Sequence, residues 1–264
     1  MKSKIYVVFL ATLLFAQIGL SQYTEKMRIY ISGGGTAAQE SIVGKTFQFP
    51  LLSRDIGGDF YTDFLGQEPN AENIKDYWKT GFNVGGGLIF DINSILAFSA
   101  DFNYNQFSFN KDFLASQIGN TLQELPINDS TTVPYNPDGL NISQGSLSII
   151  ELSFNIRAQF PHETFRPYAM GGIGYSHIGQ DVININYYDD FNIPPIPLQG
   201  NISFYDQIPS ATYDVIMMNA GVGFAAKLAK NFQPFIQANY VLGLTDGNNT
   251  VSIPIKLGFV FTLK

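Results

Sequence analysis

The 264-residue chain contains no cysteine, one tryptophan and two histidines. Without cysteine it forms neither a disulfide framework nor a thiolate metal site, and it offers no cysteine for an N-terminal lipid anchor. Basic residues are also few, with 15 Lys and Arg against 22 Asp and Glu, so the net charge is −7. This balance argues against nucleic acid as a partner.

The chain also lacks an apolar run long enough to form a membrane-spanning helix. Its longest run, residues 5–16, follows Lys2 and Lys4 and precedes Gly19-Leu20-Ser21. A charged start, a short apolar stretch and small residues are the pattern of a secretory signal peptide. We expect residues 1–21 to be this signal and residues 22–264 the mature domain; a buried first helix is the alternative.

Alternation of apolar and polar residues dominates the rest of the chain. In IELSFNIRAQF, residues 150–160, nearly every second residue is apolar. A period of two predicts a β-strand with one apolar and one polar face. Glycines obscure the two faces in residues 166–180. The predicted strands are residues 26–35, 80–90, 95–109, 146–160, 166–180, 213–228, 232–243 and 251–264.

The connections between these strands alternate in length. Short turns at residues 91–94, 161–165 and 229–231 alternate with longer segments. The longer segments are residues 36–79, 110–145, 181–212 and 244–250. Loops this long are uncommon in soluble domains, whereas transmembrane barrels have short turns at one end and long loops at the other.

The volume of a small barrel decides which face of each strand is inside. The interior of a barrel of about eight strands is just wide enough to be filled by side chains. The large apolar residues of these strands would overfill it. We therefore expect the apolar faces to contact lipid. Aromatic girdles are expected at both interfaces: Trp78, Phe82, Phe107, Phe109 and Tyr213 at the long-loop end, and Phe90, Phe160, Phe232 and Phe261 at the short-turn end.

The predicted fold is all-β, an eight-stranded antiparallel up-and-down transmembrane β-barrel with short periplasmic turns and long extracellular loops. From MRIYISGGG through RPYAMGGIGY to IPIKLGFVFTLK, the chain resembles the OmpA/OmpX-type outer-membrane β-barrel family. The resemblance covers the barrel domain and no peptidoglycan-binding domain. It implies a bacterial outer-membrane location, contact with lipid and lipopolysaccharide, and a monomeric barrel or a subunit of a larger membrane complex.

Charged residues on the polar faces predict a network inside the lumen. Its expected members are Arg28, Asp101, Glu151, Arg157 and Lys256. Glu151 and Lys256 lie on opposite strands of the ring, so they are expected to meet across it. Buried charges need partners to offset desolvation, which favours a salt-bridged plug. A narrow pore for small solutes is the alternative.

The long loops carry an excess of acidic residues, sixteen against five basic ones. Residues 181–212 have no basic residue and are rich in aromatics and proline. Such loops suit recognition of a partner protein, a glycan or lipopolysaccharide; aromatics packed against their neighbours are the alternative. The candidate recognition residues are Tyr187, Tyr188, Asp189, Asp190, Phe191, Phe204 and Tyr205.

Enzymatic signals are weak. His162 lies in a predicted turn, and His177 follows Ser176 without an obvious carboxylate partner. We expect no catalytic residue, no metal site and no cofactor. The sequence predicts a structural and interaction scaffold; a narrow pore, a lipid-modifying enzyme and a soluble lipocalin-like carrier are the alternatives.

Overall fold

The computed structural model describes residues 27–38, 51–56, 59–64, 78–121, 124–128, 131–160, 164–193, 198–229, 231–244 and 250–263. The predicted signal peptide and His162 lie outside these ranges. Among the described residues, no helix is both long and apolar enough to cross a membrane.

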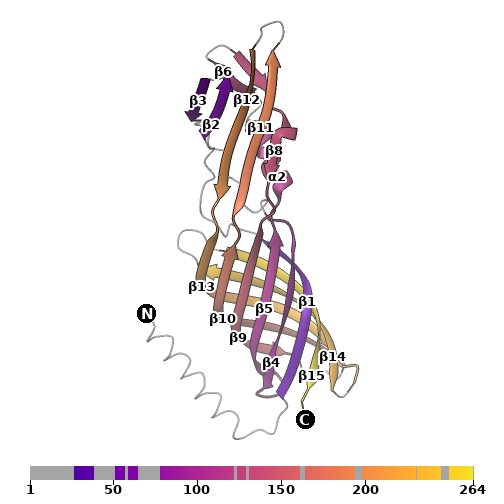
Figure 1. Ribbon diagram of the computed structural model, residues 1–264. Coiled ribbons are helices and arrows are strands. Elements are labelled where there is room, and N and C mark those ends of the chain that lie inside the picture. Colours follow the sequence, from indigo (N-terminus) through magenta and orange to yellow (C-terminus); the bar gives the residue numbers. More distant parts are fainter. Residues whose placement is uncertain are drawn as a thin grey trace, which may run out of the picture.

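Eight antiparallel strands close into a barrel in the order β1-β15-β14-β13-β10-β9-β5-β4 (Figure 1). All eight predicted strands are confirmed within a few residues at their ends. The strands are β1 (Met27–Ala38), β4 (Gly81–Asp91), β5 (Leu96–Ser108), β9 (Ser146–Gln159), β10 (Phe165–Gln180), β13 (Ala211–Ala226), β14 (Phe232–Leu244) and β15 (Thr250–Thr262).

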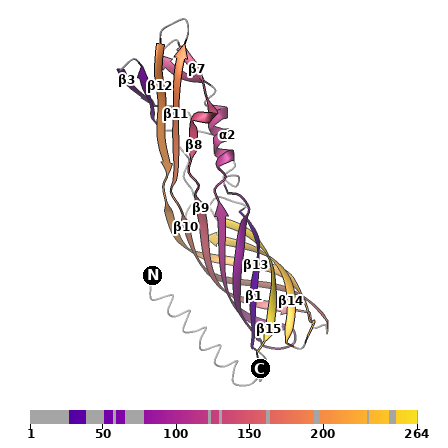
Figure 2. The ribbon, with the colours of Figure 1, turned by 45° about the vertical axis from the view of Figure 1, so that its right-hand side comes forward.

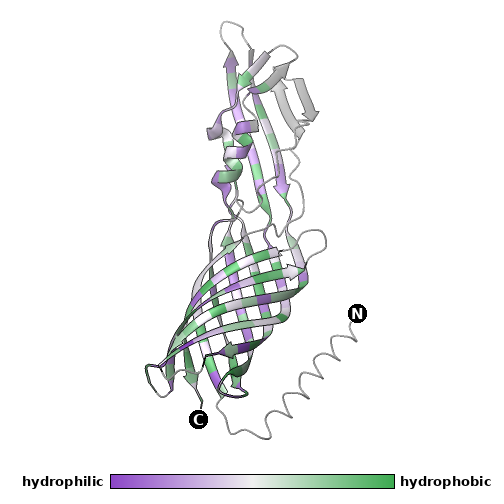
Figure 3. Ribbon diagram, turned by 180° about the vertical axis from the view of Figure 1, so that it is seen from behind, coloured by the Kyte–Doolittle hydropathy of each residue, from purple (hydrophilic) through white to green (hydrophobic). Residues whose placement is uncertain are grey.

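The outside of the barrel is apolar. On β15, Ile255 and Leu257 are 53% and 63% exposed, whereas Lys256 between them is 1% exposed. On β9, Ile156 is 62% exposed and Arg157 is 5% exposed. Hydropathy alternates along the barrel strands in the same way (Figure 3). Lipid is the solvent that tolerates so large an apolar surface, and closure pairs the backbone groups within it. The predicted eight-stranded transmembrane barrel and the outward facing of its apolar residues are confirmed.

Three aromatic side chains inside the lumen lie directly opposite glycines of neighbouring strands. The pairs are Tyr30 with Gly87, Tyr168 with Gly223, and Phe235 with Gly258. A β-carbon on Gly258 would lie 2.6 Å from Cε1 of Phe235. Glycine therefore makes room for each ring to lie over the adjacent strand. These rings belong to a small buried cluster that fills part of the lumen.

The described parts of the long loops contain further strands and helices, which the sequence analysis did not predict. β11 (Ile183–Ile193) and β12 (Leu198–Ile208) form a hairpin that extends β10 and β13 beyond the barrel (Figures 1 and 2). A five-stranded sheet has the order β3-β2-β12-β11-β8. The further elements are β2 (Leu51–Ile56), β3 (Asp59–Phe64), α2 (Lys111–Thr121), β6 (Glu124–Asn128), β7 (Thr131–Pro134), η2 (Pro137–Gly139) and β8 (Leu140–Ile142).

We call the described parts of residues 51–64, 110–142 and 183–208 the cap. The cap shares one hydrophobic core with the ends of the barrel strands that lie opposite the short turns. Leu114 and Ile118 of α2 are 1% and 0% exposed, and Tyr187 of the hairpin is 1% exposed. Tyr187 stacks on Tyr135 and on Phe204, with ring centroids 5.3 and 5.1 Å apart. The cap is thus a packed structure supported by the barrel.

This core also corrects the predicted extracellular girdle. Trp78, Phe107 and Phe109 are buried, at 8%, 0% and 2% exposed, instead of facing lipid. Trp78 and Phe109 pack edge to face with centroids 5.6 Å apart. Phe107 and Phe109 share the inward parity of β5, so their side chains meet the cap above the lumen. Phe82, 50% exposed, does lie on the outer surface.

We expect Gly223→Val to destabilise the barrel by about 1–3 kcal/mol, because the new side chain would overlap the buried ring of Tyr168. Gly171→Val on the paired strand is the control, since its β-carbon would lie 3.6 Å from the nearest backbone oxygen, that of Asn219. The measurement is the urea midpoint of unfolding in lipid vesicles. Equal midpoints for the two variants would contradict the role of the aromatic–glycine pairs.

Candidate functional site

The charged residues predicted for the lumen all lie in the buried interior. Their exposed fractions are 2% for Arg28, 4% for Asp101, 1% for Glu151, 5% for Arg157 and 1% for Lys256. Within the described residues, none of the five forms an ion pair of 4.0 Å or less with another of the five. Their direct contacts fall into three groups.

The group nearest the short turns contains Arg28 and a partner that sequence reasoning missed. Arg28 forms an ion pair with Asp91, and Gln159 Oε1 accepts a second, longer hydrogen bond from Arg28 Nη2 at 3.4 Å. We had expected Asp91 in the turn, but it is the last residue of β4. Asp91 lies two residues after the buried Ile89, so strand alternation directs both side chains into the lumen. A buried guanidinium thereby gains a charged partner.

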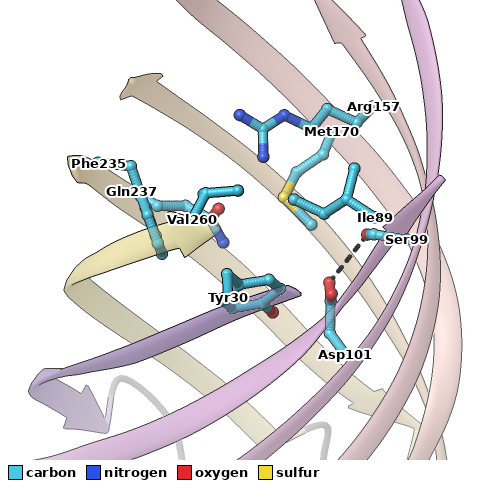
Figure 4. A pocket seen from close by; sticks show the side chains of 9 residues that line it. All are labelled: Tyr30, Ile89, Ser99, Asp101, Arg157, Met170, Phe235, Gln237 and Val260. Atoms are coloured by element: carbon cyan, nitrogen blue, oxygen red, sulfur yellow. Dashed lines mark hydrogen bonds between the residues drawn. The ribbon is translucent and has the colours of Figure 1, made fainter. Parts of the chain in front are cut away.

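The middle group surrounds a small cavity (Figure 4). Arg157 places its guanidinium carbon 3.3 Å from the ring centroid of Tyr168, a cation–π contact. Asp101 accepts hydrogen bonds from Ser99 Oγ at 3.1 Å and from Asn155 Nδ2 at 2.6 Å. The cavity measures about 10 Å³, roughly what one water molecule needs. The lumen is therefore filled at this depth.

In the third group, the charges of Glu151 and Lys256 act on each other, but the direct hydrogen bond of Lys256 goes to a neighbouring amide. Lys256 Nζ donates to Asn103 Oδ1 at 2.6 Å. Within the described part of the chain, no ion pair of 4.0 Å or less joins Lys256 to Glu151. Asn103 is the register partner of Glu151 on the neighbouring strand. The amide therefore receives the hydrogen bond expected for the carboxylate.

We expect Asp91→Ala to lower the free energy of unfolding by about 3–5 kcal/mol, because it leaves the Arg28 charge buried and unpaired. Asp112→Ala is the control: it breaks the exposed Lys79–Asp112 pair at 2.9 Å, which water screens. Urea unfolding in vesicles measures both. Similar midpoints for the two variants would show that the Arg28–Asp91 pair contributes little.

The predicted recognition residues divide between two faces of the hairpin. Tyr187, Phe191 and Phe204 are buried, at 1%, 8% and 4% exposed, so they are not available to a partner. For these three, the packing alternative holds and the recognition prediction is wrong. Tyr188 and Tyr205 are 55% and 58% exposed on the opposite face.

The two predicted aspartates of the hairpin also differ in their surroundings. Asp190 is exposed, and its Oδ1 accepts a hydrogen bond from the Tyr188 hydroxyl at 2.7 Å. Asp189 is half-buried, and its Oδ1 accepts one from Asn136 Nδ2 at 2.9 Å. Asp189 therefore links the hairpin to the segment before η2, and Asp190 remains at the surface.

The stacked tyrosines of the cap are held in their neutral form. Burial raises the pKa of Tyr187 to about 12, and burial followed by the neighbouring Tyr187 raises the pKa of Tyr135 to about 12. The backbone N–H of Asn136 donates to the Tyr187 hydroxyl at 3.3 Å. Ionising either ring would place a charge beside the apolar core.

From these raised pKa values we expect the cap to lose stability at high pH. The contribution is complete below the ordinary tyrosine pKa of 10.0 and is lost as pH rises through about 12. Trp78, the single tryptophan, lies in the same core, so its fluorescence reports the change. Tyr187→Phe keeps the stack and removes one titrating group, so its transition should be smaller. An identical transition in this variant would contradict the assignment.

His177 has a carboxylate partner that sequence reasoning did not find. His177 Nδ1 and Asp214 Oδ1 are 2.7 Å apart on the outer surface, and the Tyr175 hydroxyl donates to the same carboxylate. Asp214 is the register partner of His177, 37 residues along the chain. Ser176 instead faces the lumen, where its hydroxyl contacts Met217 Sδ at 3.0 Å. The described residues contain no group of three or more His, Cys, Asp or Glu that could hold a metal ion.

No protein-family model matches the chain, and no curated protein matches it. Solved structures with a similar arrangement include Neisserial surface protein A, with 8% identity, coverage of 89% of this chain and 97% of that one, and a TM-score of 0.43. Ail of Yersinia pestis in complex with the heparin analogue sucrose octasulfate has 13% identity, coverage of 90% and 100%, and a TM-score of 0.37. The outer membrane protease OmpT of Escherichia coli has 9% identity, coverage of 90% and 97%, and a TM-score of 0.36. These likenesses are too distant to bear on function.

Proposed function

We propose that this protein is a cell-surface recognition protein in which the barrel is the membrane anchor and the cap binds a partner. The partner would be a protein, a glycan or lipopolysaccharide. The observation that carries the proposal is the packed cap core, which fixes the β11–β12 hairpin above the membrane with one face exposed. Binding surfaces are often found on extended segments supported by a rigid scaffold.

The packing of the hairpin supports a binding role because a rigid surface loses little conformational entropy when it binds. Tyr187 is held between Tyr135 and Phe204, and Asn136 is hydrogen-bonded to Asp189. These contacts orient the outward face before any partner arrives. The outward tyrosines Tyr188 and Tyr205 then present large side chains with few rotatable bonds.

The alternatives have less support. A narrow pore would need a continuous aqueous path, whereas the lumen at the level of Asp101 and Arg157 leaves a cavity of about 10 Å³. Aqueous channels usually have about sixteen strands. A lipid-modifying enzyme could use His177 with Asp214, but Ser176 lies on the other face of β10 and supplies no nucleophile beside them. Catalysis of acyl transfer normally needs both groups within reach.

We expect the chain to lose its partner when residues 181–212 are replaced by a short Gly-Ser turn, because the replacement removes the exposed hairpin face. A tagged copy of each form would be purified from native membranes in mild detergent. Gel mobility without heating checks that the barrel of the shortened form is folded. Retention of the same partner by the shortened form would contradict the proposal. A barrel that is purified alone in both forms would favour the pore or the enzyme.

A further inference from the structure

The outward face of the cap hairpin has an unusual composition. Strand alternation directs one side of β11 and β12 into the core and the other side to solvent. Asn141 of β8 extends this outward side, since it pairs with Asn186. We call these residues the amide face: Asn141, Asn184, Asn186, Tyr188, Asp190, Asn192, Gln199, Asn201, Ser203, Tyr205 and Gln207.

We infer that the amide face binds an uncharged glycan chain, an inference that rests on the proposed recognition function. Asn and Gln side chains each carry two donors and an acceptor, and Ser and Tyr hydroxyls both donate and accept. Sugar hydroxyls also donate and accept, so neighbouring hydroxyls of one sugar match amide groups well. The amide face offers such groups at nearly every position.

The charge and composition of the amide face favour uncharged glycans over sulfated glycans, nucleic acids and protein partners. None of its residues is Lys or Arg, and Asp190 is its one carboxylate. Sulfated glycans and nucleic acids need cationic partners, which this face does not offer. None of its residues is aliphatic, whereas protein partners usually bury an apolar centre. An uncharged, hydroxyl-rich chain is the remaining good match.

The two tyrosines supply a second kind of contact with sugars. The Tyr205 hydroxyl donates to Asn184 Oδ1 at 3.0 Å, and the Tyr188 hydroxyl donates to Asp190 Oδ1 at 2.7 Å, so both rings are oriented along the sheet. Tyr188 pairs with Ser203, and Tyr205 with Asn186, so the tyrosines are diagonal neighbours about 7–8 Å apart. The C–H face of a sugar ring stacks on such an aromatic ring, so the pair can contact successive units of one chain.

The shape of the face also suits a linear polymer. β11 and β12 have 11 residues each, which corresponds to about 35 Å at roughly 3.3 Å per residue. The sheet continues sideways through β8 and β2. An extended chain could therefore lie along the hairpin and contact the amides of β11 and β12, with Asn141 of β8 beside them.

The test is binding of the full chain in lipid nanodiscs to immobilised dextran, mannan and galactan, with heparin as the sulfated probe. We expect at least one uncharged polysaccharide to bind and heparin not to bind. The double variant Tyr188→Ala/Tyr205→Ala should weaken binding about tenfold or more, as for loss of a hot-spot aromatic. Tyr240→Ala, which removes a lipid-facing tyrosine of β14 that is 49% exposed, should leave binding unchanged.

A second variant tests the charge argument by making the amide face cationic. Asn186→Lys/Asn201→Lys adds two cations to the amide face without touching the core. It should gain heparin binding and lose affinity for the uncharged polysaccharide. Wild-type binding to heparin alone, or to none of the four probes, would overturn the inference. Equal binding by the double tyrosine variant would also overturn it.

The outcomes separate this inference from the proposed function. If replacing residues 181–212 abolishes capture of a native partner but no uncharged polysaccharide binds, the recognition role stands and the glycan assignment fails. If a polysaccharide binds equally well to the shortened chain, the assignment of glycan binding to the amide face fails, and capture of the native partner still decides the recognition role. Tryptophan fluorescence of Trp78 checks in each substitution variant that the cap core is intact.

Discussion

The pairing of the first barrel strand with the last is the constraint on which the rest of the structure depends. β1 pairs with β15 from Arg28 with Thr262 to Ala38 with Ser252. In hydrocarbon, an open sheet edge would leave backbone groups without hydrogen bonds, so a barrel has to close. Closure fixes a narrow lumen, and the narrow lumen determines which side chains fit inside. The apolar belt, the glycine positions and the buried charges all follow from that limit.

The lumen balances volume against charge. Aromatic rings fill space where glycines of neighbouring strands leave room, as Tyr30 does opposite Gly87. Charged groups are divided among separate depths, where Arg28 has Asp91, Arg157 has the Tyr168 ring and Lys256 has Asn103. Each of these three cations therefore has a local partner, which offsets part of its desolvation cost. The interior is therefore filled and polar, while the apolar outer surface holds the barrel in the membrane.

Sequence periodicity was sufficient to predict the barrel because strand parity in a membrane has few alternatives. Alternation of apolar and polar residues indicated where the strands lie and which of their faces is inside. It therefore predicted that charged residues such as Glu151 and Lys256 point into the lumen. Their exact partners could not, since Asn103 and Glu151 are neighbours on paired strands and only the register shows which one Lys256 reaches. Asp214 beside His177 is hidden for the same reason.

The cap was missed although residues 183–193 alternate as clearly as the barrel strands. Long segments between barrel strands were interpreted as loops, so the aromatics at Tyr187 and Phe204 were assigned to the surface. Their inward parity with Ile183 and Ile185 was the available signal, and it would have predicted a core. The proposed recognition role therefore rests on the residues of opposite parity, including Tyr188 and Tyr205, which are exposed.

The continuity of the hairpin with the barrel has a mechanical consequence. β11 and β12 lead directly into β10 and β13, which also pair with β9 and β14. A pull on the cap would draw β10 and β13 along their axes together and load the hydrogen bonds of the β9–β10 and β13–β14 ladders in shear, instead of opening them one at a time. If a partner held the cap, tension would pass into the wall of the barrel, and its strands would resist being unzipped.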